Sequence, residues 1–319
     1  MLAAFAASQD AKDPLGGLVV GQLPEPAPPE GWEVVQVRAA TLNQHDIFAL
    51  RGVGLAGDRL PMILGTDAAG VTTDGREVIA HAVIREQGRR WSLPSERHPG
   101  TLAERVALPS DNLLDKPAEL SFEEAACLPT AYLTAYRMLF VRGGLRPGQR
   151  VLIQGATGGV ASAAIVLAAA AGLEVAATSR SQRGLELAQT LGAHHAVRSG
   201  DRVPAQVDVV IETVGEATWG HSLRAVRDGG RVVVAGGTSG PNPPADLQRV
   251  FIRGIAVMGS SMGTREELEE LIRFMLVAGV RPLIDSVHPL AHAERGFRRL
   301  LDGAAAGKVV VTPTPTSIP

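Results

Sequence analysis

Apolar and polar positions along the first 115 residues form short runs separated by proline and glycine. The runs 33–42, 76–84 and 103–109 mix branched apolar residues with single polar ones. Such runs, bounded by Pro and Gly clusters, are typical of short strands and loops. This part of the chain is therefore predicted to be rich in β-structure.

The pattern changes near residue 118. From residue 147 onward, apolar runs alternate with helical stretches, and the runs lie at 150–156, 174–179, 194–197, 207–214, 231–237 and 254–260. Continuous apolar strands of this kind are typical of a parallel sheet covered by helices on both faces. We therefore predict an α/β fold with a doubly wound parallel sheet in this part of the chain.

Two helix starts carry capping signals. Ser121 precedes Glu124 by three residues, the spacing of a capping box, and Pro129 is expected to break or kink the helix that follows. Thr264 is the expected N-cap of a later helix, which Gly279 is expected to end.

The bulk composition narrows the classes of protein that fit. A chain of 319 residues is long for one core, so two domains are expected. The net charge of −2 disfavours a nucleic-acid binder, which would carry a basic face. One cysteine, Cys127, excludes disulfides within the chain and multi-cysteine zinc sites, and it fits a cytoplasmic location. The apolar window 151–172 is interrupted by polar residues and glycines, so we expect a buried strand and helix there and no membrane partner.

A glycine turn links the strand at 150–154 to the helix after it. Gly155, Gly158 and Ala161 follow a G-x-x-G-x-x-A spacing. Glycine lets a pyrophosphate approach the backbone, and a helix N-terminus offers free N–H groups and a partial positive charge. The turn therefore fits a dinucleotide site, although a buried turn without a ligand has the same pattern.

The end of the second strand of this part is basic. No acidic residue lies between Glu174 and Glu186, whereas Ser179, Arg180 and Arg183 do. Enzymes that use NAD place an acidic residue here for the ribose hydroxyls, and an arginine suits the 2′-phosphate of NADP. The segment predicts NADP(H), with a pair of ordinary surface arginines as the alternative.

Several stretches together resemble one known family. They are 35–52 (VQVRAATLNQHDIFALRG), 61–72, 100–139, 145–168, 259–272 and 307–313. Over nearly its whole length the chain resembles the medium-chain dehydrogenase/reductase superfamily, in its zinc-free, quinone-oxidoreductase-like branch. The resemblance implies a Rossmann dinucleotide-binding domain at 121–263 and a β-rich GroES-like catalytic domain formed by 1–120 and 264–319.

The resemblance also bears on metal and activity. The positions that match the family's catalytic zinc ligands are Asn43, Thr66 and Thr130, none of which is a good zinc ligand. We therefore expect no metal and an NADPH-dependent transfer of a hydride to a quinone or an α,β-unsaturated carbonyl. Two alternatives stay open: a dinucleotide-binding sensor without efficient turnover, and an enoyl-thioester reductase.

Four residues are candidates for the chemistry. Asn43 matches the family's N-x-x-D loop and would donate to the substrate or the nicotinamide ribose, unless it only satisfies loop backbone. Asp46, in the same motif, is expected mainly to hold the loop. His45 has a side chain that titrates near neutrality and is a candidate proton donor, with an exposed loop histidine as the alternative. Tyr132 either lines the substrate pocket or packs in the core.

The turn, the basic segment and the resemblance together give a set of cofactor-binding candidates. These are Thr134, Gly155, Thr157, Gly158, Gly159, Val160, Ser179, Arg180, Arg183, Val214, Gly236, Gly237, Ser260 and Lys308. The strand at 254–260 is expected at a sheet edge, which in the resembling family pairs with a second subunit. An exposed apolar sheet edge promotes aggregation unless another strand pairs with it, so we expect a homodimer.

Overall fold

The computed structural model describes residues 1–85 and 91–313 and divides the chain into two compact units. The first unit comprises 1–130, 264–269 and 284 onward, and the second comprises 131–263 and 270–283. Residues 121–130 therefore fall in the first unit and 270–283 in the second, which differs from the domain limits expected above.

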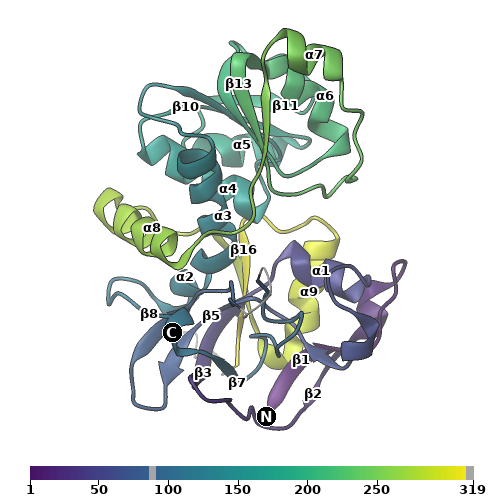
Figure 1. Cartoon of the computed structure of the whole chain (residues 1–319), viewed down its shortest axis with the longest axis vertical. Coiled ribbons are helices and arrows are strands. Elements are labelled where there is room, and N and C mark those ends of the chain that lie inside the picture. The colour runs from purple at the N-terminus through teal and green to yellow at the C-terminus, as the bar shows by residue number, and fades with distance from the viewer. Residues whose placement is uncertain (86–90, 314–319) are drawn as a thin grey trace. The chain divides into compact units, whose positions relative to one another are not determined.

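The first unit is built from two sheets. The smaller has the order β2 (Leu18–Gln22), β1 (Leu2–Ala6) and β4 (Met62–Ile63). The larger has the order β15 (Ile284–Pro289), β16 (Lys308–Thr312), β3 (Trp32–Thr41), β5 (Asp67–Thr72), β6 (Glu77–Ala80) and β8 (Leu113–Asp115), and β7 (Arg105–Pro109) also pairs with β3. The C-terminal strand β16 thus lies directly beside β3 from the start of the chain (Figure 1).

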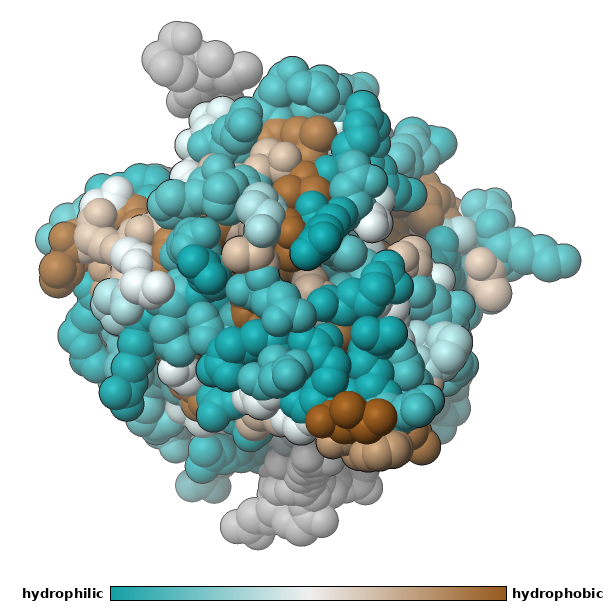
Figure 2. All heavy atoms as spheres, turned by 90° about the horizontal axis from the view of Figure 1, so that it is seen from above, coloured by the Kyte–Doolittle hydropathy of each residue, from teal (hydrophilic) through white to brown (hydrophobic). Residues whose placement is uncertain are grey.

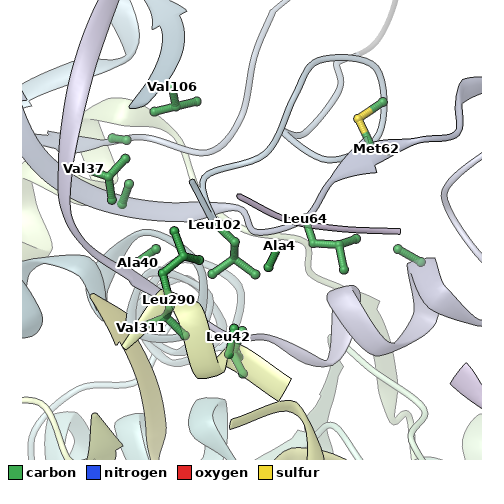
Figure 3. Packing of buried hydrophobic residues seen from close by; sticks show 14 of the residues in the cluster. Ala4, Val37, Ala40, Leu42, Met62, Leu64, Leu102, Val106, Leu290 and Val311 are labelled. Carbon is green, nitrogen blue, oxygen red and sulfur yellow. The ribbon is translucent and has the colours of Figure 1, made fainter. Parts of the chain in front are cut away.

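The described residues of this unit include the α-helices α1 (Gln44–Leu50), α2 (Phe122–Ala126) and α9 (Ala293–Leu301). Its core is apolar: Ala4, Leu64 and Leu102 lie together and are completely buried (Figure 3). Phe297 of α9, a helix that the sequence pattern did not predict, belongs to the same cluster.

The second unit contains a six-stranded parallel sheet (Figure 1). Its order is β11 (His195–Arg198), β10 (Glu174–Ser179), β9 (Arg150–Ile153), β12 (Val207–Glu212), β13 (Val226–Val234) and β14 (Ala256–Gly259). The chain order 3-2-1-4-5-6 is that of a doubly wound dinucleotide-binding fold, so the predicted fold class is confirmed. The prediction that β14 lies at an edge is also confirmed.

Helix α3 (Leu133–Tyr136) precedes the first strand of this sheet. The helices between its strands are α4 (Gly159–Ala170), α5 (Gln182–Thr190), α6 (Glu216–Ala225) and α7 (Leu247–Ile252). A further helix, α8 (Arg265–Ala278), contributes residues to both units. The α4 helix buries its small residues against the sheet, as the alanine-rich pattern predicts.

The capping predictions are confirmed at both helix starts. Ser121 Oγ accepts from the Glu124 amide at 3.1 Å, and Glu124 Oε2 accepts from the Ser121 amide at 2.9 Å. Thr264 Oγ1 accepts from the Glu267 amide at 3.2 Å. The break expected at Pro129 is also present: α2 ends at Ala126, and Pro129 lies in the π-helical segment Leu128–Tyr132 that follows.

Two loop predictions need correction. The N-x-x-D segment is not a loop, because Asn43 is the N-cap of α1 and Asp46 lies in its first turn. The polar composition of 85–100 predicts a surface loop. Residues 86–90 of this stretch lie outside the described residues, and the rest is not all at the surface: Ser92 and Ser95 are buried, and backbone hydrogen bonds join Ile84 to Ser92 and Ser95 to His98.

The face seen in Figure 2 is mostly hydrophilic, with small apolar groups between polar ones. Four of the larger exposed apolar side chains belong to α7 and β14: Leu247, Phe251, Ile252 and Val257. Within the described residues, no helix has the length and apolar character needed to cross a membrane.

Candidate functional site

A buried polar cluster lies where three neighbouring strands of the first unit meet. Asp67 begins β5, Thr41 ends β3 and Lys308 begins β16, so the strand order β16–β3–β5 brings them together. Asp67 Oδ2 accepts from Thr41 Oγ1 at 2.6 Å, from Asn43 Nδ2 at 2.8 Å and from Lys308 Nζ at 3.3 Å, and Asp67 Oδ1 accepts from Thr130 Oγ1. Both Asp67 and Lys308 are almost completely buried, so their opposite charges stabilise each other in a site that excludes water.

The three positions that match zinc ligands converge on this cluster. Asn43 Nδ2 donates to Thr66 Oγ1 at 3.1 Å, and the hydroxyl oxygens of Thr66 and Thr130 are 3.0 Å apart. The only hydroxyl hydrogen of Thr130 points to Asp67, so Thr66 is the donor to Thr130.

These residues do not fit a zinc ion. Zinc takes thiolate, imidazole or carboxylate ligands, whereas this site presents an amide and two hydroxyls whose hydrogens are already directed to acceptors. A positive charge is also present, since Lys308 Nζ donates to Asn43 Oδ1 at 2.6 Å. No group of three His, Cys, Asp or Glu residues placed to hold a metal occurs in the part of the chain that the structure describes.

Lys308 was expected at the cofactor; the structure places its ammonium in this cluster, and a contact with the cofactor stays a prediction. Its ammonium donates to Leu42 O at 3.1 Å, to Asn43 Oδ1 and to Asp67 Oδ2. An ammonium has three hydrogens, and all three have acceptors within the first unit. The geometry therefore gives Lys308 a charge-balancing role.

Asp46 fixes the backbone at two positions next to the cluster, Asn43 and Gly65. Its two carboxylate oxygens accept from the amides of Asn43 and Gly65, each at 2.8 Å. The side chain has no exposed surface, and this burial raises the pKa of Asp46 to about 6. The contacts are those of a residue that positions α1 and the turn before Thr66, and a direct part in the chemistry stays a prediction.

His45 faces a carboxylate that the sequence analysis did not single out. Its Nε2 lies 3.7 Å from Glu96 Oε1. Burial lowers the pKa of the imidazole, while the carboxylates of Glu96 and Asp67 act in the opposite direction. No sequence motif joins residues 45 and 96, so only the fold reveals this pair.

Tyr132, the fourth chemical candidate, is placed in the core of the second unit. It has no exposed surface, and its hydroxyl accepts from the Leu283 amide at 2.8 Å. Thr134, on the neighbouring α3, is also buried. The structure thus gives Tyr132 a packing role, and its contact with substrate stays a prediction.

The glycine turn of the second unit has the geometry of a phosphate site. Gly155 has a φ of +74°, which a side chain rarely adopts, and Gly158 is the N-cap of α4. The Gly155 amide donates to Thr178 Oγ1 at 3.2 Å, and the Gly158 amide donates to Gly155 O at 3.0 Å. The first amides of α4, including those of Gly159 and Val160, have no partner within the helix, as at helix N-termini that are suited to anions, and their contact with a cofactor stays a prediction.

A buried network fixes the strand ends around this turn. Gln154 Oε1 accepts from Thr178 Oγ1 at 2.7 Å, and Gln154 Nε2 donates to Ser222 Oγ at 3.0 Å. Ser222 Oγ in turn donates to Glu212 Oε2 at 2.6 Å, and Glu212 Oε1 accepts the amides of Val214 and Gly215. The sequence analysis missed this network, which ties together β9, β10, β12 and α6.

The predicted 2′-phosphate residues lie at the end of β10. A Cβ on Gly184 would be 2.0 Å from Ser179 Oγ and 3.1 Å from Thr157 Cγ2, so glycine is needed where α5 approaches the strand. Arg180 and Arg183 are exposed and form no hydrogen bond or ion pair with any residue that the structure describes. Both guanidinium groups are therefore available to an anion.

The remaining cofactor candidates follow neighbouring strands of the same sheet. Val214 lies against the turn, since a Cβ on Gly155 would be 3.0 Å from its Cγ2. Gly236 and Gly237 follow β13, and the Ser260 amide donates to Val234 O at 2.8 Å. The carboxyl ends of the strands beside a switch in strand order are where dinucleotides bind in such folds.

Comparison with known proteins agrees with this geometry. A family model described as zinc-binding dehydrogenase matches residues 159–276. The chain is 33% identical to a 2-methylene-furan-3-one reductase of Solanum lycopersicum over 301 residues, which cover 88% of this chain and 72% of that one. The chain belongs to the medium-chain dehydrogenase/reductase superfamily.

Solved structures of medium-chain dehydrogenase/reductase proteins share the whole fold. The quinone oxidoreductase of Thermus thermophilus, described with its NADPH complex, is 35% identical with a TM-score of 0.80, over 98% of this chain and all of that one. An NAD-dependent alcohol dehydrogenase is 31% identical with a TM-score of 0.90, over the same shares. The chain is thus an oxidoreductase of a dinucleotide-dependent superfamily whose members differ in cofactor and substrate.

Proposed function

We propose that this protein is a zinc-independent NADPH:quinone or enone oxidoreductase. The observation that carries the proposal is the cluster of Asn43, Thr66, Thr130, Asp67 and Lys308. At the positions of the zinc ligands, it presents neutral polar side chains and an internal cation.

A cluster whose side chains do not fit zinc provides no Lewis acid, and this limits the chemistry. A zinc ion would polarise an isolated carbonyl, whereas a conjugated carbonyl or quinone spreads the charge that develops on hydride addition over its own π-system. When bound, NADPH supplies the hydride. The name of the tomato relative describes reduction of a conjugated ketone, and the Thermus relative is a quinone oxidoreductase described with NADPH.

The residues of the second unit fit the cofactor. The turn at Gly155 and Gly158 and the N-terminus of α4 would hold the pyrophosphate. Arg180 and Arg183 would hold the 2′-phosphate, since they are unpaired among the described residues. No Asp or Glu stands at this strand end, where enzymes that use NAD carry one for the ribose hydroxyls.

The assembly and location are part of the proposal. The edge strand β14 carries the exposed Val257, and the exposed Leu247 and Phe251 lie just before it on α7. A second copy that pairs with β14 would cover this apolar edge, so we propose a homodimer. We also propose a cytoplasmic location, which the lone buried Cys127 fits.

The deciding experiment follows oxidation of NADPH by protein treated with a chelator and dialysed. We expect turnover with 9,10-phenanthrenequinone or a linear enone, and less than about 0.1 zinc per chain by elemental analysis. Bound NADPH that neither substrate oxidises would favour the sensor alternative. Turnover only with an enoyl-CoA would favour the thioester reductase, and activity that requires added zinc would refute the proposal.

A further inference from the structure

A histidine–carboxylate pair lies beside the polar cluster of the first unit. His45 stands in the first turn of α1, and its Nε2 is 3.7 Å from Glu96 Oε1. The two side chains are 22% and 21% exposed. The Nε2 atom itself is buried and has no hydrogen-bond partner among the described residues, which is costly unless a group is placed to pair with it.

Glu96 is held so that one carboxylate oxygen remains for His45. Its Oε2 accepts from the Leu93 amide at 3.1 Å, and its own amide donates to Leu93 O at 3.3 Å. Gly54 borders the pair, because a Cβ there would lie 3.5 Å from His45 Cε1 and 3.9 Å from Glu96 Oε1. The free oxygen of Glu96 is therefore directed at the imidazole in a confined space.

The charges that face His45 are those of Glu96 and Asp67. Asp67 already accepts from Thr41, Asn43, Thr130 and Lys308, so its charge is balanced. Glu96 is therefore the carboxylate that stabilises the imidazolium when His45 gains a proton. A small approach would convert the 3.7 Å contact into a charge-assisted hydrogen bond.

We propose that Glu96 is a positioning residue that makes His45 the proton donor of the reaction. This inference rests on the proposed function. With Nε2 turned to Glu96, the other ring nitrogen, Nδ1, is the one left for a substrate.

The step balances as follows. The enone is reduced while NADPH is oxidised to NADP⁺: a hydride adds to the β-carbon, and the electron pair of the carbon–carbon double bond moves to give an enolate. The enolate pair then bonds the α-carbon to the Nδ1 proton of the imidazolium, the carbonyl bond re-forms, and a saturated ketone and a neutral imidazole remain. Solvent returns the proton to His45.

The first test measures the pairing without any substrate. The pKa of His45 is followed by NMR in the whole protein, with His45→Gln used to assign its resonance. In Glu96→Gln we expect this pKa to fall by about one unit, because an opposite charge within about 4–6 Å favours the charged form. Glu294→Gln is the matched control, since Glu294 lies 3.9 Å from the exposed His292, and it should leave the His45 pKa unchanged.

The second test measures catalysis with 3-nonen-2-one and NADPH. We expect kcat of the wild type to fall as the pH rises through the His45 pKa, and Glu96→Gln to move this decline about one pH unit lower. His45→Gln should lose about 100-fold in kcat, which is typical for loss of a general acid. An unchanged His45 pKa in Glu96→Gln, or an active Glu96→Gln with the wild-type pH profile, would overturn the inference. A wild type that binds NADPH but reduces no enone would overturn the proposed function. The NMR measurement needs no substrate, so it tests the pairing of Glu96 with His45 separately.

Discussion

Replacement of Lys308 by methionine tests the charge balance of the buried cluster. Lys308 is 2% exposed and Asp67 is fully buried, with their charged atoms 3.3 Å apart. Methionine keeps most of the side-chain volume but leaves the Asp67 carboxylate without its cation. Breaking a buried ion pair in this way costs about 3–5 kcal/mol of the free energy of unfolding.

The structure favours the lower end of that range. Asp67 keeps three neutral donors, from Thr41, Asn43 and Thr130, and these continue to stabilise its charge. Two acceptors, Leu42 O and Asn43 Oδ1, lose their donor. We therefore expect a loss of about 3 kcal/mol, which corresponds to a fall in Tm of about 6–12 °C for units of this size.

The assay is urea and thermal unfolding followed by circular dichroism and tryptophan fluorescence. Lys12→Met is the control, because it removes the same charge from an exposed side chain. In the double variant with Asp67→Asn the cost should be clearly smaller than the sum of the two single costs, since removing both charges leaves none unpaired. A loss below about 1 kcal/mol for Lys308→Met, or additive costs in the double variant, would refute the buried ion pair as the organising contact of the cluster.

Three further outcomes are expected. Arg180→Ala should weaken NADPH binding about 10- to 150-fold, the value of one charge-assisted hydrogen bond, and leave NADH nearly unchanged; equal losses by calorimetry would contradict the assignment. Val257→Asp on β14 should convert a dimer to a monomer in light scattering at micromolar concentration, and a wild type that is already monomeric would contradict the proposed assembly. Asp46 has a pKa raised to about 6, so the folded state binds its proton more tightly than the unfolded state. The free energy of unfolding should therefore fall by up to about 3 kcal/mol between about pH 4 and pH 6.5, and Asp46→Asn should remove this slope; an identical slope in both proteins would argue against the shift.

Local patterns in the sequence determined much of the second unit. The strands of its sheet and the turn at Gly155, like the caps at Ser121 and Thr264 in the first unit, depend on neighbours within a few residues. Such features follow from hydrogen bonding and side-chain periodicity along a short segment, so they can be predicted without knowledge of distant contacts. The glycine turn and the basic strand end that we propose for the cofactor could be recognised in the sequence for the same reason.

Only the tertiary structure decided the composition of the polar cluster. Lys308 and Asn43 are 265 positions apart, and they meet because β16 pairs with β3 at the end where α1 begins. The pairing of those strands makes Lys308 the counter-ion of Asp67, a contact that the sequence did not reveal. Glu96 reaches His45 in the same way, from a distant part of the chain that no periodicity connects to α1. A buried charge must find its partner wherever the fold brings one within a few ångströms, and that distance is a property of the packed chain alone.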